Sequence, residues 1–274
     1  MSKAFWIVDA HSEIYRAYYA PFRNLTSPDG VPTKAVYQFT KYLLDLVQTM
    51  SPRYVAICFD PKRETLLRKQ IYPEYKAQRS TTPSDIVVQV KWCKRIVEAA
   101  GFMSLCVQGY ESDDAIATLV RQHSVDVPVV IVGKDHDLHQ HLGASVRMWG
   151  GTGYVQSADV SPPPHLVVDF KALAGCSGDN IPGAKGVGKK TALDLLHKYG
   201  SLRNVYANLE QLKPKLAERL QASKEDVWVS RKLAKPMFIE ALEPSTLSAY
   251  QYRGVNWRAV RPLFRELGFS SLLR

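Results

Sequence analysis

The chain has 274 residues, of which 46% are hydrophobic and 23% are charged, a composition that excludes a disordered or fibrous protein. It carries 36 Lys and Arg against 26 Asp and Glu, a formal net charge of +10, so we expect a polyanionic partner. No apolar run approaches the roughly 18 residues of a membrane span, and Asp9 comes too early for the apolar region of a signal peptide. We therefore expect a cytoplasmic protein that does not contact membranes.

Four short apolar segments rich in β-branched and aromatic residues punctuate the first half of the chain and predict buried strands at 5–8, 54–59, 102–107 and 128–132. A fifth strand is predicted at 145–149. Between them, Ala35 to Met50 and Ile86 to Ala100 have the apolar spacing of helices. Because strands and helices alternate, we predict an α/β fold with a mostly parallel central sheet flanked by helices.

The proline run at 162–164 marks the end of this predicted core, which we place at residues 1–164. Helical patterns dominate the rest of the chain, at 166–174, 190–199, 209–220, 225–233 and 257–267. Residues 165–274 are therefore predicted to form a helical subdomain.

Acidic residues follow the predicted strands closely. Asp9 and Asp60 end the first two strands, and the other candidates after the third and fourth strands are Glu111, Asp113, Asp114, Asp135 and Asp137. The carboxyl ends of parallel strands converge at one edge of a sheet. Each residue alone is explained as well by helix capping. Together they would repel one another without a cation, and oxygen ligands favour Mg²⁺ or Mn²⁺, so the set predicts a metal site.

A basic segment with interleaved tyrosines follows Asp60. Its basic residues are Lys62, Arg63, Arg68, Lys69, Lys76 and Arg79, and its aromatic residues include Tyr75. Basic and aromatic side chains together suit single-stranded nucleic acid, although a solvated basic helix is the alternative. Pro73 interrupts the segment, and we expect 66–79 to become ordered only when DNA binds.

The glycine-rich stretch from Gly183 to Lys189 imitates a phosphate-binding loop, but Lys190 stands where such a loop has Ser or Thr. We prefer a turn between two helices whose backbone N–H groups face DNA phosphates, which predicts duplex binding that does not depend on sequence. The residues expected to contact DNA there are Lys185, Gly186, Gly188, Lys189 and Lys190.

A resemblance to a known family extends over nearly the whole chain and rests on five segments. They are VDAHSEIYRAYYA (7–20), FDPKRETLLRKQIYPEYKAQR (59–79), ESDDAIATL (111–119), KDHDLHQHL (134–142) and GCSGDNIPGAKGVGKKTA (175–192). The chain resembles the 5′-nuclease (flap endonuclease) family, which includes the 5′→3′ exonuclease domain of bacterial DNA polymerase I and phage flap endonucleases. The resemblance implies a PIN-like 5′-nuclease core, a helical arch at about 62–82, and a helix-turn-helix variant at about 171–200 that holds duplex DNA and K⁺.

The resemblance also implies residue roles. One metal ion is expected at Asp9, Asp60, Glu111 and Asp113, and a second near Asp113, Asp114, Asp135, Asp137 and Asp179. Arg16, Lys76 and Arg79 match catalytic basic residues near the scissile phosphate. Tyr75 matches an arch residue that stacks on the terminal base.

The chain departs from the family at Cys176, where the family has a carboxylate of the second metal site. We expect Mg²⁺ as cofactor, for which Mn²⁺ substitutes. We expect two ions, with the second bound weakly, because a thiol is a poor ligand for a hard ion. The expected function is a divalent-metal-dependent, structure-selective 5′ nuclease in DNA replication or repair. It would act as a monomer, as 5′-flap endonuclease and 5′→3′ exonuclease, on 5′-flap, nicked or branched duplex DNA. The alternative is a catalytically impaired protein that binds DNA junctions.

Overall fold

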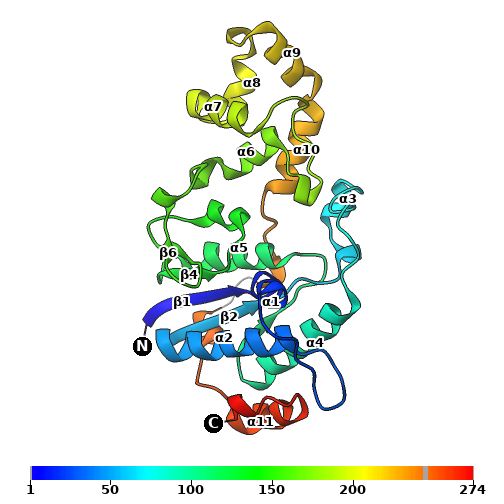
Figure 1. Cartoon of the computed structure of the whole chain (residues 1–274). Helices are drawn as coiled ribbons and strands as arrows, with labels where there is room; N and C mark the ends of the chain where they lie inside the picture. The colour runs from blue at the N-terminus through cyan, green and yellow to red at the C-terminus, as the bar shows by residue number, and fades with distance from the viewer. Residues whose placement is uncertain (1, 243–245, 274) are drawn as a thin grey trace.

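The computed structural model describes residues 2–242 and 246–273 (Figure 1). Its centre is one six-stranded sheet with the strand order β3-β2-β1-β4-β5-β6. The strands are β1 (Ser2–Asp9), β2 (Pro52–Cys58), β3 (Met103–Leu105), β4 (Val129–Val132), β5 (Val146–Trp149) and β6 (Tyr154–Val155). The pairs from β3 to β5 are parallel, and only the short edge strand β6 is antiparallel to its neighbour. The predicted α/β class with a mostly parallel sheet is confirmed.

Both faces of this sheet are covered because side chains alternate along each buried strand. Trp6 and Val8 of β1 belong to a hydrophobic cluster with α1 (Ala10–Tyr19), α2 (Lys34–Met50) and α4 (Ser84–Ala99). Phe5 and Ile7 belong to a second cluster on the opposite face, with α5 (Ser112–His123) and the 3-10 helix His136–His141. The sheet is therefore the middle of three layers.

The register of the strands brings acidic residues to one edge of the sheet. Asp9, the last residue of β1, lies opposite Cys58, two residues before Asp60. Val8 lies opposite Val132, the last residue of β4, so the loop after β4 starts beside Asp9. Parallel pairing thus places the loops with the predicted carboxylates at the same edge, as the sequence predicted.

A helical subdomain extends beyond that edge, at the top of Figure 1. It contains α6 (Val167–Ala174), α7 (Lys189–Tyr199), α8 (Leu202–Ala207), α9 (Pro214–Ala222) and α10 (Lys224–Ala234), packed around its own hydrophobic cluster. The helix predicted at 209–220 is in fact two elements, a 3-10 turn at Leu209–Gln211 and then α9. The helix α9 begins at Pro214, whose ring suits a first helical position.

The chain leaves the helical subdomain after α10 and returns to the α/β core. There α11 (Trp257–Glu266) lies at the end of the molecule opposite the helical subdomain (Figure 1). Val260 and Phe264 of α11 are fully buried in the same cluster as Trp6. The predicted extension of the helical subdomain to residue 274 is therefore wrong. The amphipathic pattern of α11 indicates that one face of the helix is buried, but it does not indicate which hydrophobic core that face packs against.

Two glycines close the loop between α6 and α7. A Cβ atom on Gly183 would lie 2.4 Å from the backbone nitrogen of Gly175, and one on Gly175 would lie 2.8 Å from the carbonyl oxygen of Ile181. Both residues have positive φ angles, 72° at Gly175 and 67° at Gly183. Only glycine fits two backbone segments that pass this closely, so these positions fix the loop that carries Asp179.

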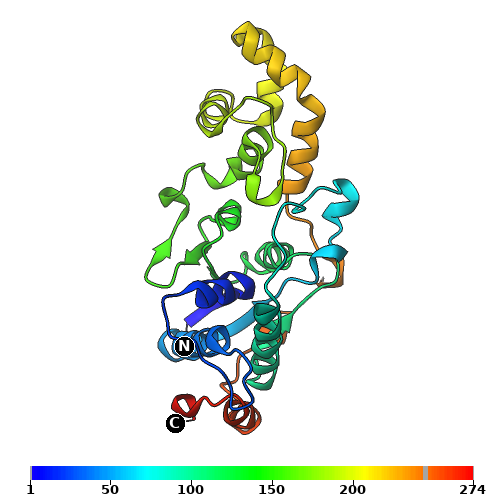
Figure 2. The ribbon, with the colours of Figure 1, turned by 45° about the vertical axis from the view of Figure 1, so that its right-hand side comes forward.

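The basic segment after β2 crosses from the core to the helical subdomain (Figure 2). It contains a 3-10 turn at Arg63–Thr65 and the four-residue helix α3 (Arg68–Ile71), followed by turns. Leu66 and Tyr75 are buried in a cluster with Ile181 and Leu233. These apolar contacts give the segment partners in the helical subdomain, and the expectation that it becomes ordered only with DNA stays a prediction. Among the described residues, no helix is long and apolar enough to cross a membrane.

Candidate metal and nucleic-acid site

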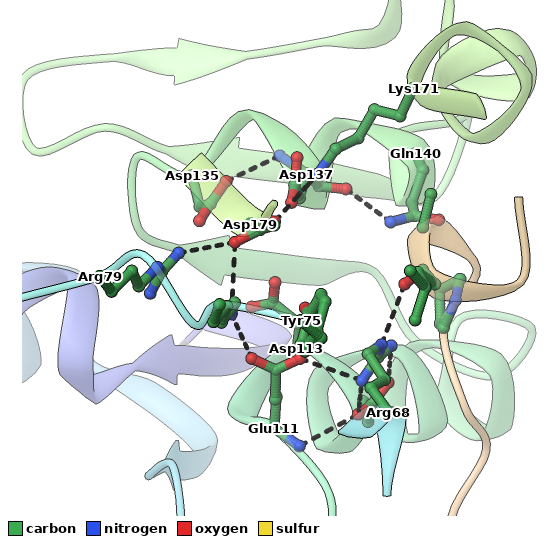
Figure 3. Close-up of a pocket in the computed structure, with 15 residues that line it drawn as sticks. Arg68, Tyr75, Arg79, Glu111, Asp113, Asp135, Asp137, Gln140, Lys171 and Asp179 are labelled. Carbon is green, nitrogen blue, oxygen red and sulfur yellow. Dashed lines mark hydrogen bonds and ion pairs between the residues drawn. The ribbon is translucent and has the colours of Figure 1, made fainter. Parts of the chain in front are cut away.

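The edge of the sheet where the loops converge contains a pocket lined mainly by charged residues (Figure 3). Six carboxylates and four basic side chains face each other there. The acidic residues are Glu111, Asp113, Asp114, Asp135, Asp137 and Asp179, and the basic residues are Arg68, Lys76, Arg79 and Lys171. The predicted carboxylates therefore come together, but they meet cations of the protein as well as each other.

Three of these carboxylates form the best candidate metal centre. Oxygen atoms of Asp113, Asp135 and Asp137 all lie within 4.8 Å of one another. Asp113 is in the first turn of α5, and Asp135 caps the 3-10 helix after β4 by accepting a hydrogen bond of 2.9 Å from the N–H of Asp137. Two elements that follow different strands thus supply the ligands, as the sequence predicted from the acidic residues after those strands.

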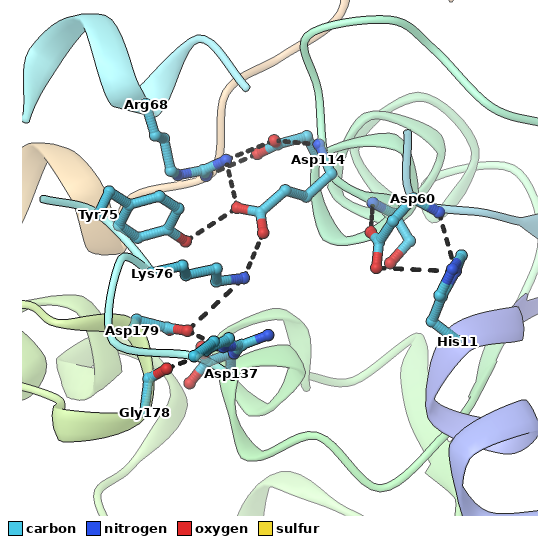
Figure 4. Close-up of polar contacts among 12 residues, drawn as sticks. His11, Asp60, Arg68, Tyr75, Lys76, Asp114, Asp137, Gly178 and Asp179 are labelled. Atoms are coloured by element: carbon cyan, nitrogen blue, oxygen red, sulfur yellow. Dashed lines mark hydrogen bonds and ion pairs between the residues drawn. The ribbon is translucent and has the colours of Figure 1, made fainter. Parts of the chain in front are cut away.

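Asp9 and Asp60 are held beside this cluster by a residue that the sequence analysis missed. The backbone N–H of Ser112 donates a 2.7 Å hydrogen bond to Asp60 Oδ1, and the Ser112 hydroxyl lies 3.4 Å from Asp9 Oδ1. His11 was missed as well; its Nδ1 accepts a 3.0 Å hydrogen bond from the backbone N–H of Asp60 (Figure 4). Ser112 lies between Glu111 and Asp113, and His11 is two residues after Asp9, and this closeness in the chain was the only signal available.

The carboxylates of this cluster carry more negative charge than the protein neutralises. Burial, reinforced by the charge of Asp60, raises the pKa of Asp9 to about 8. Burial also raises the pKa of Asp113 well above its ordinary value, and the charges of Asp9 and Asp135 add to the effect. Such a set of clustered oxygen donors, of which Asp9 is buried and Asp135 exposed, fits a divalent cation, which would relieve the repulsion.

Asp60 differs from these two residues. Burial alone would raise its pKa, but His11, the N–H of Ser112 and Lys76 outweigh burial and hold the pKa of Asp60 below its ordinary value. Asp60 is therefore an anion at neutral pH and is available as an oxygen ligand.

Asp179 lies on the side of the pocket away from Asp60, among basic side chains (Figure 4). Its Oδ1 accepts a 2.7 Å hydrogen bond from Arg79 and is 3.5 Å from Lys76 Nζ, while its Oδ2 is 3.3 Å from Lys171 Nζ. Burial alone would raise the pKa of Asp179, but Lys76, Lys171 and Arg79 together lower it. Lys171 was not predicted from the sequence, because one lysine on a helix gives no sign of the carboxylates that it contacts.

Arg68 and Asp114 form a buried pair, which corrects two predictions (Figure 4). Arg68 is 5% exposed and Asp114 is 0% exposed, and two parallel hydrogen bonds of 2.6 and 2.7 Å join the guanidinium to the carboxylate. Asp114 Oδ1 also accepts a hydrogen bond from the N–H of Met237. Arg68 therefore does not present its charge to DNA, and Asp114 is an ion-pair partner rather than a metal ligand.

The predicted stacking role of Tyr75 is also wrong for the structure described, because this residue is only 3% exposed. Its hydroxyl donates a 2.8 Å hydrogen bond to Glu111 Oε2, which also accepts one of 3.1 Å from Arg68. Lys76 contacts the other oxygen of Glu111. Glu111 thus anchors the basic segment to α5, and its predicted role as a metal ligand stays a prediction.

The other predicted contacts lie at the surface or at the edge of the pocket. Arg16 pairs with the buried Glu13 through a 2.9 Å hydrogen bond and covers the ring of Tyr42. Arg63 donates to the carbonyl oxygen of Arg79 over 3.2 Å, and Lys62 and Lys69 belong to the same segment. Lys185, Gly186, Gly188, Lys189 and Lys190 are exposed, and Gly188 is the N-cap of α7. Their roles with DNA stay predictions.

Comparison with known proteins identifies the family. The N-terminal resolvase-like domain of the 5′-3′ exonucleases matches residues 4–163, and their C-terminal SAM fold matches residues 162–253. The thermostable DNA polymerase I of Thermus thermophilus is 36% identical over 277 residues, which cover 97% of this chain and 32% of the polymerase. The chain thus spans about a third of the length of that relative.

Two solved structures share the fold. One is the bacteriophage T5 D15 flap endonuclease in a complex with DNA and metal ions, with a TM-score of 0.74, 19% identity, and coverage of 90% of this chain and 96% of that one. The other is the eukaryotic junction-resolving enzyme GEN-1 binding potassium, with a TM-score of 0.58, 15% identity, and coverage of 96% and 65%. Both exonuclease domains match, together covering residues 4–253, and the parallel strands of the sheet end in the carboxylates that the sequence motifs predicted. This chain therefore belongs to the 5′-3′ exonuclease family.

Proposed function

We propose that the chain is a divalent-metal-dependent, structure-selective 5′ nuclease that hydrolyses DNA phosphodiesters near junctions between single-stranded and duplex DNA. The observation that carries this proposal is the cluster of Asp113, Asp135 and Asp137 at the carboxyl ends of the strands, with Asp9 and Asp60 beside it. The basic side chains of Lys76 and Arg79 face the same pocket, where a phosphate would lie between them and the cluster.

Asp113 and Asp135 of this cluster, together with Asp9, would hold the first Mg²⁺, whereas Asp137, which also contacts Lys171, would lie between the first and second metal positions. Mn²⁺ would substitute for Mg²⁺ because it prefers similar oxygen ligands. A bound ion would supply charge neutralisation at the reacting phosphate and a water molecule of lowered pKa. Lys76 and Arg79 now pair with Glu111 and Asp179 and would exchange these partners for the phosphate oxygens of the substrate. Arg16 on α1, whose side chain is 42% exposed and pairs with Glu13, would contact the DNA strand that carries this phosphate.

The loop from Gly183 to Lys190 would hold the duplex part of the substrate. Its lysines are exposed, and the first backbone N–H groups of α7, which has no side-chain cap, suit a phosphate. We extend the proposal to K⁺ at this loop, because GEN-1, which has the same fold, binds potassium. The DNA complex of the T5 flap endonuclease, which has the same fold, supports DNA as the substrate. We extend the proposal to 5′-flap, nicked or branched duplexes, cleaved by a monomer in the cytoplasm.

The second metal ion is the part of the proposal that Cys176 affects. Among the described residues, the polar side-chain contact of Cys176 is with Asp179, 3.9 Å away, and not with Asp9, Asp113 or Asp135, so the thiol leaves the ligands proposed for the first ion complete. The alternative of an impaired DNA-junction binding protein required the thiol to abolish catalysis. We therefore propose an active enzyme in which a second ion binds weakly.

The experiment that tests the proposed function uses a duplex with a labelled 5′ flap, with Mg²⁺, with Mn²⁺ or with a chelator. We expect metal-dependent release of the flap, and slower cleavage of a single strand of the same sequence. Binding of the flap duplex without cleavage at any metal concentration would refute the nuclease and leave a DNA-binding protein.

We predict different effects for the two groups of basic residues. Lys76→Ala and Arg79→Ala should lower the single-turnover cleavage rate more than they weaken binding, because these side chains face the reacting phosphate. Lys189→Ala and Lys190→Ala should weaken binding and reduce the slope of log affinity against log salt by about 0.9 each, with little effect on the saturated rate. If all four variants change only binding, Lys76 and Arg79 are ordinary phosphate contacts.

A further inference from the structure

Lys171 on α6 is a buried cation between two acidic residues. Its residue is 9% exposed, which is rare for lysine unless the side chain is paired. Its ammonium donates to Asp137 Oδ2 and lies 3.3 Å from Asp179 Oδ2 (Figure 3). One positive charge of the protein thus joins a carboxylate of the core to a carboxylate of the helical subdomain.

Cys176 lies at the same place. Its Sγ is 3.9 Å from Asp179 Oδ2, the oxygen that also faces Lys171. The ammonium of Lys171 thus contacts two carboxylates, and the thiol of Cys176 lies next to one of them. A hard divalent ion needs several oxygen ligands, and here the available oxygens already face a cation.

The first metal position is different. Among the residues that the structure describes, Asp9, Asp113 and Asp135 take part in no ion pair within 4.0 Å, whereas Asp137 and Asp179 do. The negative charge of the first three carboxylates thus has no described cation of the protein beside it, whereas that of Asp137 and Asp179 is balanced by basic side chains. This asymmetry does not follow from Cys176 alone, because a thiol adds no positive charge.

We propose that the ammonium of Lys171 is the resident cation of the second metal position, so that the protein binds one divalent ion tightly and admits a second only by displacing Lys171. This inference rests on the proposed metal centre. Lys171 is a positioning residue: it holds Asp137 and Asp179 together and supplies, without a metal, a positive charge at that side of the pocket. The loss of a carboxylate at Cys176 is then tolerated because the lysine has taken over the charge.

The test is a count of bound Mn²⁺ per chain, from the electron paramagnetic resonance signal of free Mn²⁺ during titration of the full chain. We expect one tightly bound ion for the wild type and one for Cys176→Asp, because Lys171 still fills the second position. We expect two for Lys171→Met/Cys176→Asp, with the second bound at least ten times more tightly than in the wild type. Two tight ions in Cys176→Asp alone, or only one in the double variant, would overturn the proposal.

Two further variants separate charge from general disturbance of the fold. Lys171→Arg/Cys176→Asp keeps the positive charge and should bind one ion; two ions there would show that charge does not block the site. Lys198→Met/Cys176→Asp removes an exposed lysine of α7 and should also bind one ion, whereas two would overturn the proposal. Thermal melting followed by circular dichroism verifies that each variant is folded. If the double variant with Met unfolds, the count for Cys176→Asp still decides.

The same titration separates this inference from the proposed function. A wild-type chain that binds no Mn²⁺ would refute the metal centre itself, and the inference with it. A wild-type chain that binds two ions with similar affinity would overturn only the role of Lys171 and leave the nuclease intact.

Discussion

Asp113→Asn is expected to lower the rate of metal-dependent cleavage about a thousandfold, which corresponds to about 4 kcal/mol of lost transition-state stabilisation. Asp113 offers an oxygen within 4.8 Å of ligand atoms from both Asp135 and Asp137, so the substitution removes a charge at the centre of the metal cluster. Binding of a flap duplex should change by no more than a few-fold, because Asp113 is not a phosphate contact. Single-turnover cleavage and equilibrium binding of the same substrate measure the two effects.

The same variant should change stability in opposite directions with and without metal. Burial and the charges of Asp9 and Asp135 disfavour the Asp113 anion, so its removal should stabilise the metal-free protein. An ion present at a hundred times its dissociation constant should stabilise the wild type by about 2.7 kcal/mol, or roughly 5–10 °C in Tm. Asp113→Asn should lose most of that gain.

The matched control is Asp29→Asn, which neutralises an exposed aspartate in the loop before α2 and should change neither the cleavage rate nor the metal-dependent shift in Tm. A variant at Asp113 that cleaves at the wild-type rate, or that gains as much stability from Mg²⁺ as the wild type does, would contradict the assignment of this cluster as the metal centre.

Sequence reasoning succeeded where the signal is local. The alternating apolar side chains of β1, with Trp6 and Val8 on one face and Phe5 and Ile7 on the other, are visible in the printed sequence as a continuous apolar run. A run buried on both faces predicts a parallel strand, and parallel strands bring the acidic residues that follow them to one edge. The fold class and the position of the carboxylates at that edge follow from this pattern.

Sequence reasoning failed where the partner of a charged residue lies far away in the chain. Arg68 lies 46 residues from Asp114, and Tyr75 lies 36 residues from Glu111. A row of basic residues indicates charge, but it cannot show which members point inward to a buried carboxylate. Lys171 was missed although Asp179 is only 8 residues away, because its other carboxylate, Asp137, is 34 residues away in a 3-10 helix of the core.

Arg68→Met is expected to destabilise the metal-free protein by about 3–5 kcal/mol, because removal of one partner of a buried ion pair leaves the other charge uncompensated. For a chain of this size that corresponds to a fall of roughly 6–20 °C in Tm. The pair also joins three segments: Arg68 Nε donates a 2.9 Å hydrogen bond to the carbonyl oxygen of Leu233, and Asp114 Oδ1 accepts one of 2.8 Å from the N–H of Met237. Thermal melting in a chelator measures the loss without any contribution from metal.

Lys69→Met is the matched control, because this neighbour in α3 is half-buried and its substitution should change the free energy of unfolding by about 1 kcal/mol or less, as is usual for surface charges. Adding Asp114→Asn to Arg68→Met removes the uncompensated charge and keeps an oxygen that can accept the hydrogen bond from Met237, so the double variant should recover about half of the lost stability. A DNA-contacting Arg68 would behave in the opposite way. Its substitution would leave Tm unchanged and reduce the salt slope of DNA binding by about 0.9. That pair of results would restore the role read from the sequence and refute the structural one.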